Sequence, residues 1–472
     1  MDDYASHDAT ALAALIAGGE ISSQEALDAA ILRAEARNPA INALSQRLFD
    51  HGRAAIAAGL PQGPFRGVPF LLKDASAELK GHVTANGARL LAKGAAAGGD
   101  STLVARYKAA GLVIFGKTAT PEFSLAASTE TSLTGATRNP WSLARSAGGS
   151  SGGAAAAVAA GIVPAAHGSD GGGSIRIPAS CCGLFGMKPS RARNSSGPLM
   201  GEGWGSLSVA HVLTRSVRDS AAMLDASQGM APGDPYCAPP RLRPYAEEVR
   251  RDPGPLRIGW HIAPMSGGAV ADPCRVAAED AARLLAALGH EVEQITLPGC
   301  HEPLARAIWV LVASNVARSI RAIGEYRGRA VTEEEVERVT WSAVEEARSM
   351  TAESYAEALH QIHAQSRRMA DLHSRIGVIL CPTLAAPPPL LGVHRTDTDD
   401  IPAYRAALAA FTPYTQLYNM TGAPSMSVPL CWADGLPVGV MLSADFGRED
   451  ILFRLAGQLE QARPWFHRLA PQ

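Results

Sequence analysis

The stretch that decides the fold is residues 145–178, which read RSAGGSSGGAAAAVAAGIVPAAHGSDGGGSIRIP. Two runs rich in glycine and serine, 148–153 and 170–174, enclose an alanine-rich helix predicted at 153–160 and a short apolar strand predicted at 162–166. Runs of this kind are usually flexible linkers. That interpretation fails here, because apolar elements that must pack border both runs. Such turns instead let backbone N–H groups approach a substrate oxygen closely.

Outward from this stretch, apolar strands and helices alternate along the chain. A capping-box start at Ser22 predicts a helix within 9–44, and Ser101 and Gly111 bound another predicted over 101–110. Alternation of this kind is typical of an α/β fold with a largely parallel or mixed sheet. The other expected helices cover 275–288, 333–375 and 449–462, and the other expected strands cover 68–72, 112–115, 256–260, 291–297, 378–380, 425–430 and 438–443.

The composition excludes several classes of protein. The chain has 472 residues, 47% of them hydrophobic and 19% charged, and a net charge of -2. The hydrophobic content is too high for a mainly disordered chain, and the balanced charge argues against a nucleic-acid-binding protein. We therefore expect a large globular protein without a nucleic-acid partner.

Several features favour a reducing compartment. The seven cysteines are scattered and never occur as C-x-x-C, so neither a disulfide framework nor a zinc ribbon is indicated. The first Lys or Arg is Arg33, whereas a secretory signal needs positive charge near the start. The longest run of small apolar residues, 154–166, is too short to span a bilayer. We expect a cytoplasmic protein with no membrane partner and no metal.

Three short patterns suggest other chemistry. Residues 111–118 fit the phosphate-loop pattern G-x-x-x-x-G-K-T, but the middle residues are themselves a predicted strand, so we reject that interpretation. The His360-x-x-His363 pair on a helix has no evident third metal ligand. The serine run fits G-x-S-x-G, the nucleophile elbow of hydrolases with a histidine partner, and that alternative stays open. The downstream histidines available to it are His211, His261 and His290.

Longer blocks of sequence resemble the amidase signature family. They span nearly the whole chain in the expected order, and the central block is long enough to be highly specific. The resemblance implies the amidase signature fold, in which helices sandwich a large, mixed, mostly parallel twisted sheet. It also implies a hydrolase acting on carbon–nitrogen bonds other than peptide bonds. The matching blocks are 68–74 (VPFLLKD), 116–118 (GKT), 121–123 (PEF), 139–141 (NPW), 148–153 (GGSSGG), 171–179 (GGGSIRIPA), 183–190 (GLFGMKPS), 215–219 (RSVRD) and 435–440 (GLPVGV).

The same resemblance predicts a single domain over residues 1–472, although the length alone also allows two or three domains. Residues 65–220 would form the signature core with the catalytic residues. Residues 230–400 would form a more variable helical region, and 401–472 the C-terminal strands and helix that complete the core.

Three positions match a Ser–cis-Ser–Lys triad. The resemblance implies that Ser174 is the nucleophile that forms an acyl-enzyme, Ser150 the bridging serine and Lys73 the base. The spacing of 24 residues between the two serines agrees with the family and selects Ser150 rather than Ser151. A serine hydroxyl needs a base within hydrogen-bond reach. A lysine can be that base near neutral pH when burial lowers its pKa.

Neighbouring residues are expected to support these three. Gly149 eases the geometry of the peptide bond before Ser150. Asp170 and Arg176 are expected to brace the glycine turn, and Ser151 to be structural, as a helix cap. The implied oxyanion hole consists of the backbone N–H groups of Gly171, Gly172, Gly173 and Ser174.

The substrate is less determined than the reaction. The N-terminal half and the closing segment are most similar to 6-aminohexanoate cyclic-dimer hydrolases, the nylon-oligomer amidases, and to related urethane and aryl-amide hydrolases. The resemblance implies small-molecule substrates, either linear or cyclic amides, aryl amides or carbamates, and no cofactor. The alternative is an A-type subunit of a glutamyl-tRNA amidotransferase, which acts inside a complex.

The substrate pocket is expected in the more idiosyncratic stretches of the chain. Trp204, within 195–205, and Trp309, within 308–326, offer aromatic surface suited to an apolar substrate group. Asn419 is a candidate for a polar contact. A homodimer is the one oligomer that we consider.

Overall fold

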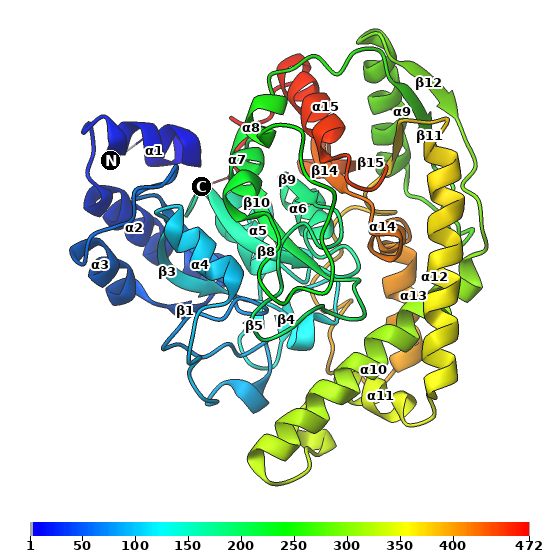
Figure 1. Cartoon of the computed structure of the whole chain (residues 1–472), viewed down its shortest axis with the longest axis horizontal. Helices are drawn as coiled ribbons and strands as arrows, with labels where there is room; N and C mark the ends of the chain where they lie inside the picture. The colour runs from blue at the N-terminus through cyan, green and yellow to red at the C-terminus, as the bar shows by residue number, and fades with distance from the viewer. Residues whose placement is uncertain (1–2, 472) are drawn as a thin grey trace.

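The fold is built around one sheet of eleven strands, which a computed structural model describes for residues 3–471 (Figure 1). In order across the sheet, the strands are β1 (Leu44–Arg47), β3 (Val113–Thr118), β2 (Pro69–Lys73), β8 (Ala165–Asp170), β10 (Val209–Thr214), β9 (Phe185–Lys188), β14 (Ser425–Ala433), β15 (Leu436–Ala444), β13 (Val378–Pro382), β11 (Arg257–Trp260) and β12 (Glu291–Gln294). Strands from near both ends of the chain share this sheet, and that continuity supports our proposal of a single domain.

The predicted mixed sheet between helices is confirmed, but antiparallel pairings outnumber parallel ones, so the expectation of a mostly parallel sheet is corrected. Parallel ladders join β2 to β3 and β8 at one end and β11 to β12 and β13 at the other. Antiparallel ladders connect these two ends through β8, β10, β9, β14, β15 and β13. The strands in the middle of the sheet are therefore paired antiparallel. Two short hairpins lie outside it and pair β4 (Glu130–Thr131) with β5 (Gly135–Ala136) and β6 (Arg138–Asn139) with β7 (Ser142–Ser146).

Helices cover both faces of the sheet (Figure 1). They are α1 (Ala9–Ala17), α2 (Ser23–Ile41), α3 (Phe49–Ala57), α4 (Thr102–Ala109), α5 (Gly152–Ala159), α6 (Arg176–Cys182), α7 (Val217–Ser227), α8 (Tyr245–Glu248), α9 (Asp272–Ala287), α10 (His301–Arg327), α11 (Arg338–Ala347), α12 (Ala352–His373), α13 (Ile401–Phe411), α14 (Gln416–Thr421) and α15 (Glu449–Ala462). Phe185 and Met187 of β9 lie in a core with α7, α9 and α15. A side chain at Gly186, between them, would meet Ala179 of α6 at 2.6 Å. Because successive strand residues point to opposite faces, α6 lies on the face opposite to α7, α9 and α15.

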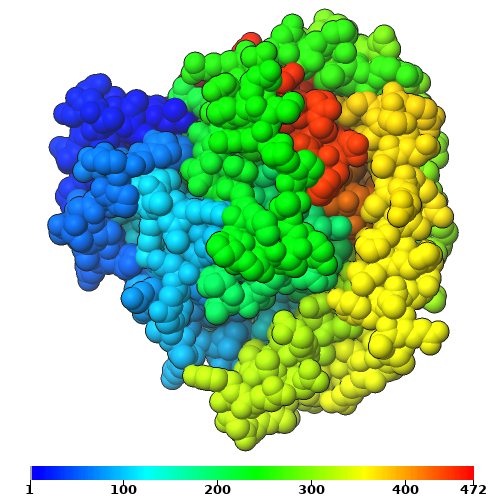
Figure 2. Space-filling view, in the orientation of Figure 1, coloured from blue at the N-terminus to red at the C-terminus, as the bar shows by residue number. Residues whose placement is uncertain are grey.

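The helices α10, α11 and α12 form a separate layer beside the sheet. Figure 2 shows α12, in yellow, along one side of the molecule, with the green segments around α7 and α8 over the middle of the same face. Helix α10 packs on α11 and α12 around a core that includes Leu311, Val316 and Ile362. By length and composition α10 could cross a membrane, and half of its apolar window is buried within the protein.

Predicted helix starts are confirmed where a capping residue marks them. Ser22 and Glu25 form a reciprocal capping box at the start of α2, and the Ser101 side chain accepts a hydrogen bond from the Val104 amide at the start of α4. The β-α-β unit of β11, α9 and β12 and the closing helix α15 also lie where the sequence predicts them.

Two predicted segments differ from the structure. The strand expected at 162–166 is β8, which begins at Ala165 and runs to Asp170. Its second half, His-Gly-Ser-Asp, has a loop-like composition, yet it is paired residue by residue with β10 and buried. The 27-residue helix α10 is absent from the prediction. Within the region 230–400, strands β11, β12 and β13 lie at the strands expected over 256–260, 291–297 and 378–380.

We predict that Gly153→Ala destabilises the protein. A Cβ atom at position 153 would lie 2.4 Å from the Ala119 nitrogen and 2.5 Å from the Ala43 oxygen, and these backbone atoms cannot move independently. Overpacking of this kind typically costs about 1–3 kcal/mol. Denaturant unfolding measures the loss. Gly98→Ala is the matched control, because a Cβ there meets nothing within 4 Å; equal effects of the two substitutions would contradict the prediction.

Candidate active site

The three residues predicted as a triad come from three chain segments. Lys73 ends β2, Ser150 lies in the turn before α5, and Ser174 lies in the turn between β8 and α6. The Lys73 Nζ donates to the Ser150 Oγ at 2.6 Å. Ser150 and Ser174 both line a cavity of about 390 Å³. The Gly149–Ser150 peptide bond is cis. The structure therefore brings all three predicted residues to one place.

Lys73 is completely buried, with a relative exposure of 0%. Burial penalises the charged ammonium and lowers the pKa of Lys73 to about 7, although the negative charge of Asp170 opposes that shift. A lysine with this pKa is largely neutral just above neutral pH. It can then accept a proton from a serine hydroxyl.

Strand β8 supplies two contacts to Lys73 that the sequence prediction missed. The Ser169 Oγ accepts a second hydrogen bond from the Lys73 Nζ at 2.9 Å. The His167 Nδ1 accepts the backbone N–H of Lys73 at 3.2 Å, and burial together with the charge of Lys73 lowers the pKa of His167 to about 3. His167 and Ser169 are two residues apart and share one face of β8. Recognising that the strand continues to residue 170 would have revealed them.

The turn after β8 is organised by the Asp170 carboxylate. Its oxygens accept hydrogen bonds from the backbone N–H groups of Gly173 at 2.7 Å and Ile175 at 3.1 Å. The Gly173 amide is therefore already occupied, and the prediction that it belongs to an oxyanion hole is corrected. Within residues 3–471, the amides of Gly171, Gly172 and Ser174 have no hydrogen-bond acceptor.

Arg176 and Asn419 donate hydrogen bonds to the Asp170 carboxylate. The Arg176 Nη2 and Nε donate to the two carboxylate oxygens of Asp170 at 2.8 and 2.9 Å, and the Asn419 Nδ2 donates to one of them at 2.9 Å. Burial alone would raise the pKa of Asp170, but the charge and hydrogen bonds of Arg176 hold it well below its usual range. Asn419 is only 1% exposed. The predicted role of Asn419 as a substrate contact is wrong, because its amide is used up inside this buried network.

Ser151 and Gly149 have structural roles around Ser150. The Ser151 Oγ donates to the Ser169 backbone oxygen at 3.1 Å and accepts from the Ser169 amide at 3.3 Å. Ser151 occupies the N-cap position of α5, but its side chain makes no capping hydrogen bond. Its side chain instead joins the start of α5 to the backbone of β8. At Gly149, a Cβ atom would lie 2.4 Å from the Ser128 backbone oxygen, so the turn packs too closely for any side chain.

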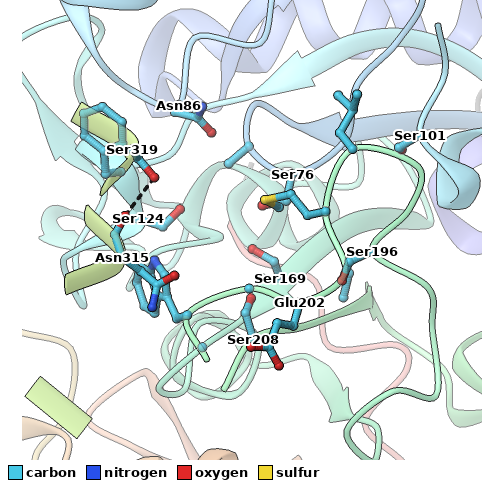
Figure 3. Close-up of a pocket in the computed structure, with 18 of the residues that line it drawn as sticks. Ser76, Asn86, Ser101, Ser124, Ser169, Ser196, Glu202, Ser208, Asn315 and Ser319 are labelled. Carbon is cyan, nitrogen blue, oxygen red and sulfur yellow. Dashed lines mark hydrogen bonds between the residues drawn. The ribbon is translucent and has the colours of Figure 1, made fainter. Parts of the chain in front are cut away.

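Several hydroxyl and amide side chains line the cavity beside Ser174. Figure 3 shows Ser76, Asn86, Ser196, Asn315 and Ser319 around it, from loops and from α10. The predicted pocket residues Trp204 and Trp309 take different positions. Trp204 lines this cavity, whereas Trp309 lines a neighbouring cavity of about 120 Å³.

The geometry supports neither a phosphate loop nor a nucleophile elbow with a histidine partner. Residues 113–118 form the buried strand β3, so they are not a phosphate loop. The three candidate histidine partners are engaged elsewhere: His211 contacts Ser220, His261 contacts the Ala263 oxygen, and His290 contacts Gln458. In the described part of the chain, none of them contacts Ser150 or Ser174.

A model of the amidase family matches residues 25–453, and the chain belongs to that family. Its activity is the hydrolysis of carbon–nitrogen bonds in small-molecule amides. The predicted family and reaction class are thus confirmed.

Particular relatives cover almost the whole chain. The 6-aminohexanoate-cyclic-dimer hydrolase of Pseudomonas sp. (strain NK87) is 39% identical, over 98% of this chain and 96% of its own. A solved structure of 6-aminohexanoate cyclic dimer hydrolase superposes with a TM-score of 0.93 at 38% identity, covering 98% of each chain. A bacterial aryl acylamidase of the amidase signature family superposes with a TM-score of 0.88 at 28% identity, covering 97% of this chain and 96% of its own.

We predict that Arg176→Leu lowers the free energy of unfolding by about 3–5 kcal/mol, because it leaves the buried Asp170 carboxylate without its cationic partner. Denaturant unfolding measures the change. Arg257→Leu is the matched control, since Arg257 pairs with Glu293 where both side chains are more than half exposed, and exposed pairs contribute less than about 1 kcal/mol. Similar losses in the two variants would argue against the bracing role.

Proposed function

We propose that the chain hydrolyses its substrates through a Ser174 acyl-enzyme, with Ser150 as the proton bridge and Lys73 as the base. The observation that carries this proposal is the 2.6 Å hydrogen bond between the Lys73 Nζ and the Ser150 Oγ inside a fully buried environment. A lysine placed only for structure would more commonly keep its charge in solvent or pair it with a carboxylate.

The first half of the reaction forms the acyl-enzyme. The neutral Lys73 takes the Ser150 proton while Ser150 takes the proton of Ser174, whose oxygen attacks the substrate carbonyl carbon. The carbonyl oxygen becomes an oxyanion and accepts hydrogen bonds from the free amides of Gly171, Gly172 and Ser174. Losing one such donor typically costs about 10²–10³ in rate. The proton then returns through Ser150 to the departing nitrogen, and the carbon–nitrogen bond breaks.

The second half releases the acid. A water molecule gives its proton to the same relay and attacks the ester carbonyl, and Ser174 leaves with a proton from Ser150. A carbamate follows the same route, because its attacked carbonyl differs only in carrying an oxygen substituent.

The substrate class is proposed from the cavity and the relatives together. A cavity of about 390 Å³ falls within the range of small-molecule sites. Linear or cyclic amides such as 6-aminohexanoate oligomers, aryl amides and carbamates are the candidates. The seven cysteines are all free, which supports the proposal of a reducing, cytoplasmic setting. The proposal of a homodimer rests on the sequence prediction alone.

Amine release by the chain alone tests this function. We expect the wild-type protein to release amine from at least one of an aryl acetamide, an aryl carbamate, the 6-aminohexanoate cyclic dimer and a primary amide. Ser174→Ala and Ser150→Ala should abolish release, whereas Ser151→Ala, the matched control next to the bridge, should keep a substantial part of it. No release from any substrate by the folded wild-type chain would favour the amidotransferase-subunit alternative.

The pH dependence tests the base. Because the neutral form of Lys73 is the active one, kcat/KM should rise with pH through about 7 and level off above it. An unperturbed lysine, with a pKa of about 10.4, would place that rise near pH 10. Lys73→Arg should be inactive throughout, because arginine stays protonated. A rise confined to pH above 9, or an active arginine variant, would exclude the neutral-lysine base.

A further inference from the structure

Ser174 lies between two cavities of different size. The larger, of about 390 Å³, and the smaller, of about 120 Å³, share four wall residues, which are Ser124, Gly171, Ser174 and Trp204. A carbonyl carbon attacked by Ser174 carries its acyl chain and its nitrogen on different sides. One substituent can therefore enter each cavity.

The two cavities differ in chemistry. The smaller one is lined mainly by apolar side chains, among them Ile177, Ile308, Val312 and Leu408. The larger one carries the hydroxyl and amide side chains that Figure 3 labels. The smaller cavity therefore favours a hydrocarbon group, and the larger one favours a group that forms hydrogen bonds.

The position of Ser150 decides which half of the substrate enters which cavity. Ser150 lines the larger cavity and is absent from the wall of the smaller one. In the proposed reaction Ser150 protonates the departing nitrogen, so that nitrogen must lie on the side of the larger cavity. This reasoning rests on the proposed function. We propose that the larger cavity binds the amine half of the substrate and that the smaller, apolar cavity binds a short, unbranched aliphatic acyl chain.

Trp204 forms the partition between the two sites. A Cβ atom on Gly171 would lie 2.8 Å from the Trp204 Cε3, so the indole lies directly against the glycine whose amide is a proposed oxyanion donor. The indole also packs on the core between the loop and α10 that includes Leu207 and Leu311. A partition held in this way limits the width of the acyl group.

The small volume of the second cavity favours a short acyl chain. An apolar cavity of about 150 Å³ in another protein accommodates benzene, and this cavity has about 120 Å³. A cavity of this size favours an acyl chain of a few carbons over an aromatic or branched group. The substrate class is then a linear amide with a short aliphatic acyl chain and a larger, hydrogen-bonding amine.

Helix α10 provides a matched pair of test positions. Val312 lines only the smaller cavity, and Ser319, about two turns later on the same helix, lines only the larger one. Replacing each by phenylalanine fills one cavity without touching the wall of the other.

The experiment measures kcat/KM for acetyl, butyryl, hexanoyl and benzoyl nitroanilides, which share one amine. The wild-type protein should prefer the aliphatic amides to the benzoyl amide by at least tenfold, since a change of one methylene in an apolar pocket is worth about 10–200-fold. Val312→Phe should lower the butyryl-to-acetyl ratio at least tenfold. Ser319→Phe should change that ratio by less than about twofold, while lowering hydrolysis of acetamides of bulkier amines.

A second variant protects the test against misfolding. Val312 is buried at 8% exposure, so its replacement could unfold the protein. Leu408→Phe on α13 fills the same cavity from a half-buried position and should lower the ratio in the same way. If both folded variants keep the wild-type ratio, or if Ser319→Phe lowers it equally, the assignment is overturned and the proposed amidase mechanism stands. If the wild-type protein hydrolyses none of these amides but releases amine from another substrate of the panel used to test the proposed function, the assignment is overturned and the proposed function stands. If it releases amine from no substrate in either panel, the proposed function falls and the assignment falls with it.

Discussion

The constraint on which the site depends is the exclusion of water from the Lys73 amine. A charged ammonium is costly to bury without a carboxylate in contact with it, and the side-chain hydrogen bonds of Lys73 go to two hydroxyls, Ser150 and Ser169. The protein therefore stabilises the neutral form of this lysine. The negative charge that acts on Lys73 is that of Asp170, and it is paired directly with Arg176. Because Arg176 pairs with Asp170, the carboxylate stays charged in the turn after β8. Lys73 can still lose its proton near neutral pH.

The sheet makes this arrangement possible by ordering β2, β8 and β10 side by side. Strand β8 is central to this arrangement, because its residues contact both Lys73 and the turn that follows the strand. His167 and Ser169 contact Lys73, and Asp170 directs the turn that follows. The backbone of Ser169 is in turn held by Ser151. The two contacts with Lys73 join residues more than 90 positions apart in the chain, whereas Asp170 acts on the turn directly after it.

Much of this could be predicted from the sequence, and the failures have physical reasons. The helix starts at Ser22 and Ser101 follow from local capping patterns. The positions of the proposed triad and of the Asp170–Arg176 brace follow from the resemblance to the amidase signature family. The extent of β8 was missed because its polar residues have poor strand propensity, and pairing with β10 overrides that propensity. Asn419 was misjudged because its buried partners lie about 250 residues earlier in the chain. Gly173 was misjudged because a glycine run does not reveal which of its amides a neighbouring carboxylate occupies.

The shape of both cavities beside Ser174 depends on the position of helix α10. Its successive turns line both cavities beside Ser174, and the helix is anchored by α11 and α12 rather than by the sheet that carries the triad. The proposed triad and this helical part of the cavity walls therefore belong to different packing units. A sequence can change in the helical layer without disturbing the sheet, but a shift of α10 along its axis alters both cavities at once. A substitution that moves α10 therefore changes selectivity for both halves of the substrate together. The same substitution leaves the proposed catalytic residues in place.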